Sequence, residues 1–275
     1  MLGKLFRNEF KCTWKTVLTV YAVVAAATIL GCLFLGVDVF RTGKVGQFMA
    51  VTFILSYVLA IAALFLVTFI FLGVRFYKTM YSDQGYLTHT IPVSPLANLN
   101  VKLVTSLVWM LISGLIFLIS VGALAFAGDS DCVIAIFKDM TLDGLNQWCN
   151  DIFGYGFFAS LGILFLLVIF GCLNALGMIY AALSLGQLFN QHKIGASIGC
   201  GIGIYFIQQI ISSVLLISWM NTVVVKLTYR GEELVTNNLS ESSGIIWPTL
   251  IIYAVYAGLE YLITAWIVNK HINLD

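Results

Sequence analysis

Three long polar side chains lie deep inside long apolar stretches of this sequence, where a carboxyl or an amide group could do chemistry. Gln208 and Gln209 lie near the middle of one stretch, and Glu260 lies near the middle of the last one. A carboxylate at the centre of a bilayer is costly, so such a residue usually faces a cavity or a polar partner. One interpretation is that Glu260 lines a translocation path or relays protons. The other is that its carboxyl group is hydrogen-bonded, to a glutamine for example, and ties helices together.

A second group of polar residues interrupts the apolar sequence at residues 75–102. Asp83 predicts the start of a short helix, because an aspartate caps free amide groups at a helix N-terminus. Pro92 predicts its end, because proline lacks an amide proton. A short helix with exposed tyrosine and leucine suits insertion into a groove of another protein, and the alternative is an ordinary connector at the membrane interface. The residues that form or frame the predicted helix are Asp83, Gly85, Tyr86, Leu87 and Pro92.

We recognise no motif of a common catalytic or metal site, and we expect no G-x-S-x-G that would support a hydrolase. The sequence has no G-x-x-x-x-G-K-[ST] loop for nucleotide phosphate and no H-E-x-x-H zinc motif. Its three histidines are widely separated, and its six cysteines form no C-x-x-C pair. We therefore expect no catalytic, cofactor-binding or metal site on this chain. Cys132 and Cys149 share one loop, where a disulfide and two free thiols both remain open.

Composition indicates an integral membrane protein. The chain is 60% hydrophobic and 10% charged, with a mean hydropathy of +0.99, whereas soluble domains average about 25% charged residues. The apolar residues form blocks of about 20, the length that crosses a bilayer core about 30 Å thick. Helices are expected there, because lipid offers the backbone no hydrogen bonds. We predict an all-α fold in one membrane domain over residues 1–275, with spans near 17–37, 48–74, 103–127, 154–182, 195–220 and 246–268.

Lysine and arginine are unevenly distributed between the two ends of these spans. With the N-terminus inside, nine lie on the cytoplasmic side and five on the outer side, which is the bias expected of cytoplasmic loops. Both termini are therefore predicted to be cytoplasmic. The net charge of +1 gives no general attraction to nucleic acid.

The N-terminal residues predict an amphipathic helix. Five apolar residues recur at helical spacing, with basic residues between them. This pattern is typical of a helix in the plane of the interface, with aromatic rings at the acyl boundary and basic groups facing headgroups. The alternative is a plain positively charged anchor. The apolar residues are Leu2, Leu5, Phe6, Phe10 and Trp14.

Small and polar residues also predict helix contacts. Gly195, Gly199 and Gly203 repeat every four residues, which permits the close approach of another helix. They would serve packing within the chain or dimerisation. Asn174 is a further candidate for a hydrogen bond between helices.

Residues 83–94 resemble a known signature. They read Asp-Gln-Gly-Tyr-Leu-Thr-His-Thr-Ile-Pro-Val-Ser and are followed by Lys102. This is similar to the Asp-Glu-Gly-Tyr-Leu-Thr…Leu-Pro-Val-Ser…Lys signature of bacterial ABC transporter permeases of the type-2 exporter class. The first eleven and the last six residues also resemble the ends of that family. Gln84, His89 and Ile91 differ from its common residues.

The resemblance implies a transmembrane permease subunit of an ATP-driven exporter in the plasma membrane. The loop at 75–102 would carry a coupling helix, formed or framed by Asp83, Gly85, Tyr86, Leu87 and Pro92, that docks on a separate ATP-binding cassette subunit. ATP and Mg would be bound by that subunit, so this chain would be no enzyme and would hold no cofactor. A second permease chain, identical or related, is also expected, within the lipid bilayer.

Two other functions remain open from the sequence. One is an ion-coupled secondary transporter that uses Glu260, Gln208 and Gln209. Such carriers often have internal repeats and broken helices, whereas we find no clear repeat between residues 1–127 and 154–275 and expect spans without proline interruptions. The other is a membrane protein that transports nothing and anchors or assembles other proteins.

Overall fold

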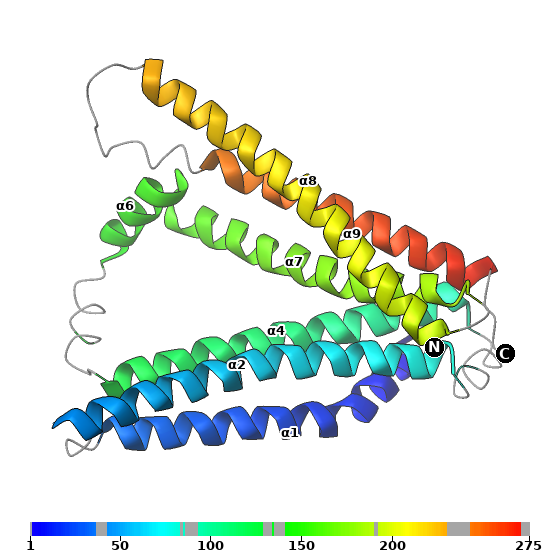
Figure 1. The fold of residues 1–275 in the computed structure, drawn as a ribbon, viewed down its shortest axis with the longest axis horizontal. Coiled ribbons are helices and arrows are strands. Elements are labelled where there is room, and N and C mark those ends of the chain that lie inside the picture. Colours follow the sequence, from blue (N-terminus) through cyan, green and yellow to red (C-terminus); the bar gives the residue numbers. More distant parts are fainter. Residues whose placement is uncertain are drawn as a thin grey trace. The chain divides into compact units, whose positions relative to one another are not determined.

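The computed structural model describes residues 2–36, 43–82, 85, 93–128, 134, 141–189, 192–229 and 243–270. Over these ranges the chain is helical and contains no strand, so the predicted all-α fold is confirmed (Figure 1). The helices are α1 (Leu2–Gly36), α2 (Gly43–Met80), α4 (Pro95–Gly128), α6 (Leu142–Phe153), α7 (Phe157–Gly186), α8 (Lys193–Tyr229) and α9 (Ser243–Lys270).

Six of these helices are long and apolar enough to cross a membrane, which confirms the predicted number of spans. The stretches that meet these criteria of length and composition are Gly3–Leu33, Val51–Met80, Pro95–Gly128, Phe157–Gly186, Lys193–Leu215 and Ile246–Lys270. The expectation of spans without proline was wrong, because Pro248 lies inside α9. It is the sixth residue of that helix, where its missing amide removes a hydrogen bond near the helix start rather than in the middle of the span.

The predicted N-terminal helix is continuous with the first span. At 1.5 Å per residue, the 35 residues of α1 extend about 52 Å, well beyond a bilayer core of about 30 Å. The ribbon of α1 changes direction near its N-terminal end (Figure 1). Phe10 stacks on Trp109 of α4 with ring centroids 4.5 Å apart, so this ring packs on protein rather than on acyl chains. Trp14 is 47% exposed, as a residue at the membrane interface would be.

Helix α6 lies in a stretch that the sequence had indicated only as a loop. Thr141 caps its start by accepting a hydrogen bond from the Gly144 amide at 3.2 Å. Gly154 ends it with φ at +73°, a left-handed conformation that glycine adopts readily. The Asn146 side chain then accepts a hydrogen bond from the Phe157 amide at 2.8 Å, which ties α6 to the start of α7.

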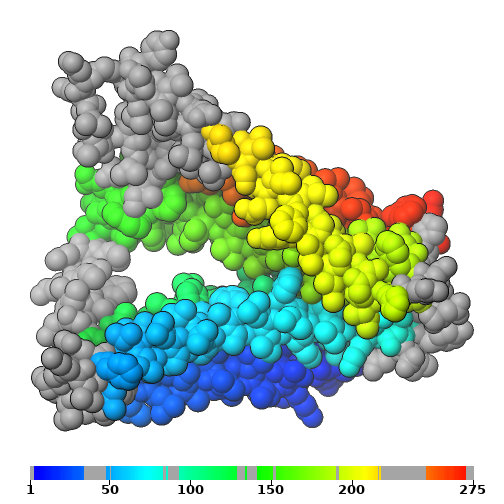
Figure 2. Space-filling model, in the orientation of Figure 1, coloured from blue at the N-terminus to red at the C-terminus, as the bar shows by residue number. Residues whose placement is uncertain are grey.

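Contacts divide the chain into two compact units. Unit 1 contains residues 1–79 and 88–139, and unit 2 contains residues 80–87 and 140–275. Within unit 1, α1 packs against α4, and within unit 2, α7 packs against α8 and α9. In Figure 2, α2 of unit 1 and α8 of unit 2 each present a face that no other described helix of the same unit covers. These helices carry large exposed apolar side chains, including Leu55, Leu59, Ile207 and Ile210, as expected of surfaces that meet lipid or another membrane chain.

Candidate functional site

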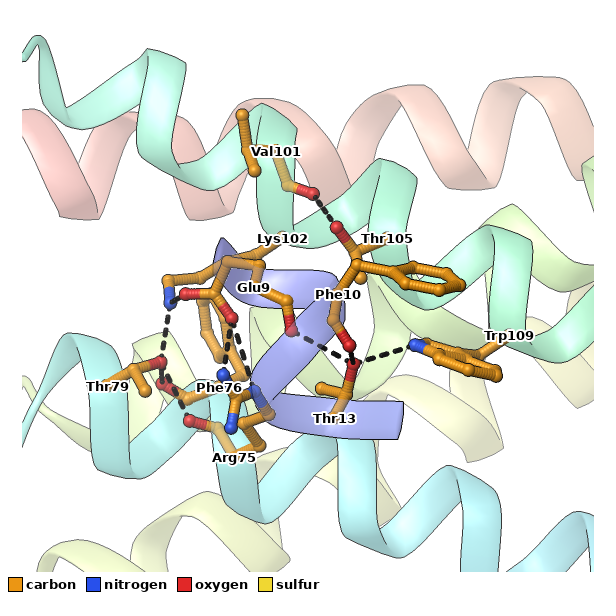
Figure 3. Close-up of polar contacts among 10 residues, drawn as sticks. All are labelled: Glu9, Phe10, Thr13, Arg75, Phe76, Thr79, Val101, Lys102, Thr105 and Trp109. Carbon is orange, nitrogen blue, oxygen red and sulfur yellow. Dashed lines mark hydrogen bonds and ion pairs between the residues drawn. The ribbon is translucent and has the colours of Figure 1, made fainter. Parts of the chain in front are cut away.

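A polar cluster in unit 1 joins α1 to the end of α2 and the start of α4. The carboxylate of Glu9 is at its centre (Figure 3). Its Oε2 accepts hydrogen bonds from Arg75 Nη2 at 2.7 Å and Nε at 3.2 Å, and its Oε1 accepts one from Lys102 Nζ at 2.7 Å. Lys102 also donates to Thr79 Oγ1 at 2.7 Å. We call Glu9, Arg75, Thr79 and Lys102 the Glu9 cluster.

Water has little access to the Glu9 cluster. The side chains of Lys102, Glu9 and Arg75 are 5%, 14% and 22% exposed. Charges removed from water need partners, because their lost hydration must be replaced. Here one carboxylate serves two cations, so the cluster carries a formal charge of +1. Among the described residues, Glu9 is therefore the only acid in these ion pairs, and neither cation has a second carboxylate within ion-pair distance.

A line of hydrogen bonds continues from the Glu9 cluster along the contact between α1 and α4. The indole Nε1 of Trp109 donates to Thr13 Oγ1 at 2.8 Å. Thr13 in turn donates to the backbone oxygen of Glu9 or Phe10, one turn back along α1. One turn further along α4, the Tyr21 hydroxyl lies 3.0 Å from the Ser113 hydroxyl. These bonds fix the rotation of α1 against α4, and that rotation turns Glu9 inward.

An apolar groove lies further along the same pair of helices. Its volume is about 450 Å³, and it is lined almost entirely by carbon. The lining side chains come from α1 and α4 and include Leu18, Ala25, Ile29, Ile116 and Ile119. A groove of this chemistry accepts an acyl chain or another apolar group.

From the sequence, Glu9 belonged only to the N-terminal residues that resemble the family, and its ion pairs with Arg75 and Lys102 were not predicted. One signal was available: Glu9 is the only acid among the first 37 residues, in a segment rich in lysine and arginine. Arg75 and Lys102 were counted among the lysines and arginines of the cytoplasmic side, and Lys102 was also part of the family-like signature. Their sequence separations from Glu9 are 66 and 93 residues, so helical spacing alone gave no indication of the cluster.

Most of the predicted docking residues lie outside the described residues: Asp83, Tyr86, Leu87 and Pro92. Gly85 is described and buried, and its amide donates to the Ser82 carbonyl at 2.6 Å. Four residues before Gly85, Tyr81 is 5% exposed. Its hydroxyl lies 2.7 Å from Ser184 Oγ of α7, within unit 2. Burial raises the pKa of Tyr81 to about 12. The phenol is therefore neutral throughout the physiological pH range.

The second polar cluster joins three helices of unit 2. Gln208 of α8 donates from Nε2 to Glu260 Oε1 of α9 at 2.7 Å and to Asn174 Oδ1 of α7 at 3.2 Å. The structure thus brings Glu260, Gln208 and Asn174 together in the arrangement that ties helices. Gln209, the other predicted polar residue, is exposed and takes no part in it. We call Asn174, Gln208 and Glu260 the Glu260 cluster.

One oxygen of Glu260 remains without a partner. The residue is 3% exposed, and its Oε2 is buried with no hydrogen bond. Gly177 of α7 makes room for this oxygen, because a Cβ atom there would lie 2.5 Å from it. An unpartnered carboxyl oxygen in such a place is costly. It is the kind of group that a proton, a cation or a donor from a ligand would satisfy.

The glycines Gly195, Gly199 and Gly203, predicted to pack α8 against another helix, make no close helix contact within unit 2. A Cβ atom would meet nothing within 4 Å at Gly199 or Gly203, and only His192 Cβ at 3.9 Å at Gly195. Helix α8 instead turns Ser197 and Gly201 toward α7, where they meet Gly186 and Ala182. These residues are offset by two positions from the glycines, about 200° around a helix, so the ridge faces away from α7. Dimerisation through the ridge stays a prediction.

Residues 195–199 do spell G-x-S-x-G, a motif of hydrolase nucleophiles, so the expectation that this motif is absent was wrong. In those enzymes the serine is exposed on a sharp turn between a strand and a helix. Ser197 instead lies inside α8, is 4% exposed, and donates from Oγ to the Lys193 carbonyl at 2.9 Å. This serine therefore packs helices and has no access to a substrate.

The cysteines and the other possible metal ligands are the last candidate groups. Among the described residues, no three His, Cys, Asp or Glu side chains gather where a metal ion would bind. Cys149 is a buried free thiol, and Cys132 lies outside the described residues. No protein-family model, no curated protein and no solved structure matches this chain. What the chain is shown to be is a multi-pass, all-α membrane protein with two buried polar clusters, one in each unit.

Proposed function

We propose that this chain is the transmembrane permease subunit of an ATP-driven exporter in the plasma membrane. It would couple ATP hydrolysis on a separate ATP-binding cassette subunit to the export of a substrate, with both termini in the cytoplasm. The six spanning helices are compatible with this function, and the sequence of residues 83–94 resembles the family signature. A second permease chain, identical or related, would complete the transporter.

We call residues 83–92 the coupling segment. The observation that carries the proposal is that buried polar contacts hold the helices on both sides of it. Arg75 in the last turns of α2 and Lys102 in the third turn of α4 both bind Glu9. Thr79, also in the last turns of α2, accepts a hydrogen bond from Lys102. The chain passes from unit 1 to unit 2 between Thr79 and Met80, and Tyr81 is bonded to α7. A connector without a mechanical role would not need these buried polar contacts on both of its sides.

Buried anchors suit a segment that transmits force. Met80 is fully buried and Tyr81 is 5% exposed, and close-packed side chains transmit a displacement with little slack. A push from the cassette subunit on residues 83–92 would therefore move α2 and α4 of unit 1 and α7 of unit 2. The proposed role of this chain is mechanical: it would change the arrangement of its helices in response to a motor on another subunit.

The chemistry of the spans bears on the substrate. The groove between α1 and α4 is apolar, and among the described residues the only acidic side chain in the spans of unit 2 is Glu260. A hydrophobic or amphipathic substrate fits such surfaces better than a highly charged one, because burial of unpaired charge is costly.

One observation favours the ion-coupled alternative. Glu260 has a buried, unpartnered oxygen, and an intramembrane carboxyl of this kind is a common proton or ion site. Replacement of Glu260 by Gln keeps its size and removes its charge. An ion-coupled carrier would lose transport in E260Q, whereas the proposed permease would keep ATP-dependent transport.

The deciding experiment is capture of the chain's partners from gently solubilised native membranes. We expect a protein with a nucleotide-binding G-x-x-x-x-G-K-[ST] motif to copurify with the wild type. It should be lost from the Y86D/L87D variant, because two carboxylates would enter an apolar docking groove. The matched control is I134D/L142D, which places two carboxylates at exposed apolar positions of the predicted outer loop and should keep the partner. If no ATP-binding protein copurifies, or if Y86D/L87D retains it, the proposal is wrong.

A further inference from the structure

The N-terminal part of α1 carries its basic residues on one exposed face. Lys4, Arg7, Lys11 and Lys15 are separated by three, four and four residues, and all four are exposed. Residues at this spacing lie above one another along a helix. We call these four residues the basic stripe. Their charges add up along about three turns of helix.

The acid in this segment is turned away from the stripe. Glu9 lies between Arg7 and Lys11 in sequence, yet it points toward α2 and α4 (Figure 3). Among the described residues, its ion pairs go to Arg75 and Lys102, and none involves the stripe. The Glu9 cluster therefore has a second effect, because it turns the only carboxylate of residues 2–16 away from the face of α1 that carries the basic stripe.

The stripe lies beyond the part of α1 that the bilayer core needs. Residues 17–36 supply about 30 Å of helix, enough to cross the core. Residues 2–16 supply a further stretch of about 22 Å that extends from it. Beside the stripe, Trp14 is 47% exposed and Leu18 is 51% exposed. A tryptophan next to lysines at the end of an apolar span is typical of the headgroup level.

We propose that the basic stripe binds the phosphate-bearing headgroups of anionic lipids, so that the N-terminal part of α1 rests on a negatively charged membrane surface. Four cations lie on one face beside an interfacial tryptophan, and none of them forms an ion pair within the part of the chain that the structure describes. Their charge complements that of a negatively charged lipid surface. The inference concerns this chain and its lipids, and it does not depend on any ATP-binding partner.

The test measures which lipid lies next to Trp14. The full chain is reconstituted in phosphatidylcholine vesicles that contain a small fraction of a brominated lipid, either phosphatidylglycerol or phosphatidylcholine. Bromine quenches tryptophan fluorescence at short range, and the Trp14 signal is the difference between wild type and W14F. We expect the brominated anionic lipid to quench Trp14 more strongly, with enrichment falling up to about five-fold for each stripe cation removed. High salt should reduce the preference, because it screens exposed charges.

Variants distinguish the effect of the basic stripe from that of exposed cations elsewhere on the chain. The K4Q/R7Q/K11Q/K15Q variant should show equal quenching by the two lipids. The K4R/K11R/K15R variant keeps the charge and should keep the preference, which guards against a loss caused by altered folding. Lys78 and Lys270 are exposed cations elsewhere, and the K78Q/K270Q variant should also keep it. Equal quenching in the wild type, or a preference that survives in the glutamine variant, would overturn the proposal. If the basic stripe binds an acidic protein instead of lipid headgroups, equal quenching in the wild type is the expected result.

Discussion

Replacement of Glu9 by Gln isolates the energetic role of the Glu9 cluster. Glutamine has almost the same shape as glutamate, and its one carbonyl oxygen accepts hydrogen bonds without charge. Lys102, whose side chain is 5% exposed, would keep its bond to Thr79 and lose its counter-ion. Arg75 is 22% exposed and recovers part of its hydration. The main cost of E9Q therefore falls on Lys102.

Breaking a buried ion pair by removing one partner costs about 3–5 kcal/mol. Because the glutamine oxygen remains as an acceptor and Arg75 is partly hydrated, we expect E9Q to lower the free energy of unfolding by about 2–3 kcal/mol. K102M removes the buried charge itself and leaves Glu9 paired with Arg75, so its cost is about 1 kcal/mol. In the double variant E9Q/K102M no buried lysine remains, and we expect a loss of about 1–2 kcal/mol, less than the sum of the two single losses.

The assay is unfolding by increasing SDS in mixed micelles, followed through tryptophan fluorescence, because Trp109 stacks on Phe10 beside the cluster. N8A, one residue away on the exposed face of α1, is the control and should stay within about 0.5 kcal/mol of the wild type. Two results would refute the reasoning. One is an E9Q variant as stable as N8A, and the other is a double variant whose loss equals the sum of the single losses.

Two further predictions concern packing and hydrogen bonding within the units. G177A should lower the free energy of unfolding by about 1–3 kcal/mol, because its Cβ would lie 2.5 Å from Glu260 Oε2; G162A on the same helix, where a Cβ meets nothing within 4 Å, should be neutral or slightly stabilising in the same SDS titration. T13V removes the acceptor of the Trp109 indole N–H and should cost about 1–3 kcal/mol. T13S, which keeps the hydroxyl, should cost less in that titration, and equal losses for T13V and T13S would contradict the importance of this bond.

The length and number of the helices were predictable from the sequence, but the contacts between them were not. Apolar blocks of about 20 residues predict spans whatever their neighbours, because the bilayer imposes the helix on each block separately. The Glu9 cluster depends instead on how α1 is rotated against α4. Likewise, a four-residue glycine period predicts that one face of α8 is smooth, without indicating which helix meets that face. Within unit 2, α8 meets α7 through Ser197 and Gly201, which lie on the opposite side of α8 from the three glycines.

The Glu260 cluster was partly predictable. A carboxyl and an amide deep in different spans have few alternatives to bonding each other, so Gln208 was a reasonable expectation as a partner of Glu260. Helical rotation again decided between the two adjacent glutamines, since Gln208 points inward and Gln209 is exposed. Gly177 makes room for the side chain of Glu260, which lies 83 residues further along the chain. No local sequence pattern therefore predicts this role.

The pairing of Glu9 with Arg75 and Lys102 has a consequence for biosynthesis. The chain is made from its N-terminus, so Glu9 leaves the ribosome 66 residues before Arg75 and 93 residues before Lys102. During that interval Glu9, in the N-terminal part of α1 that precedes the first span, has neither of its two partners. The cluster closes only when the start of α4 has arrived, after two spans have already been inserted. Its closure thus marks the moment at which three separately inserted helices become one folded unit.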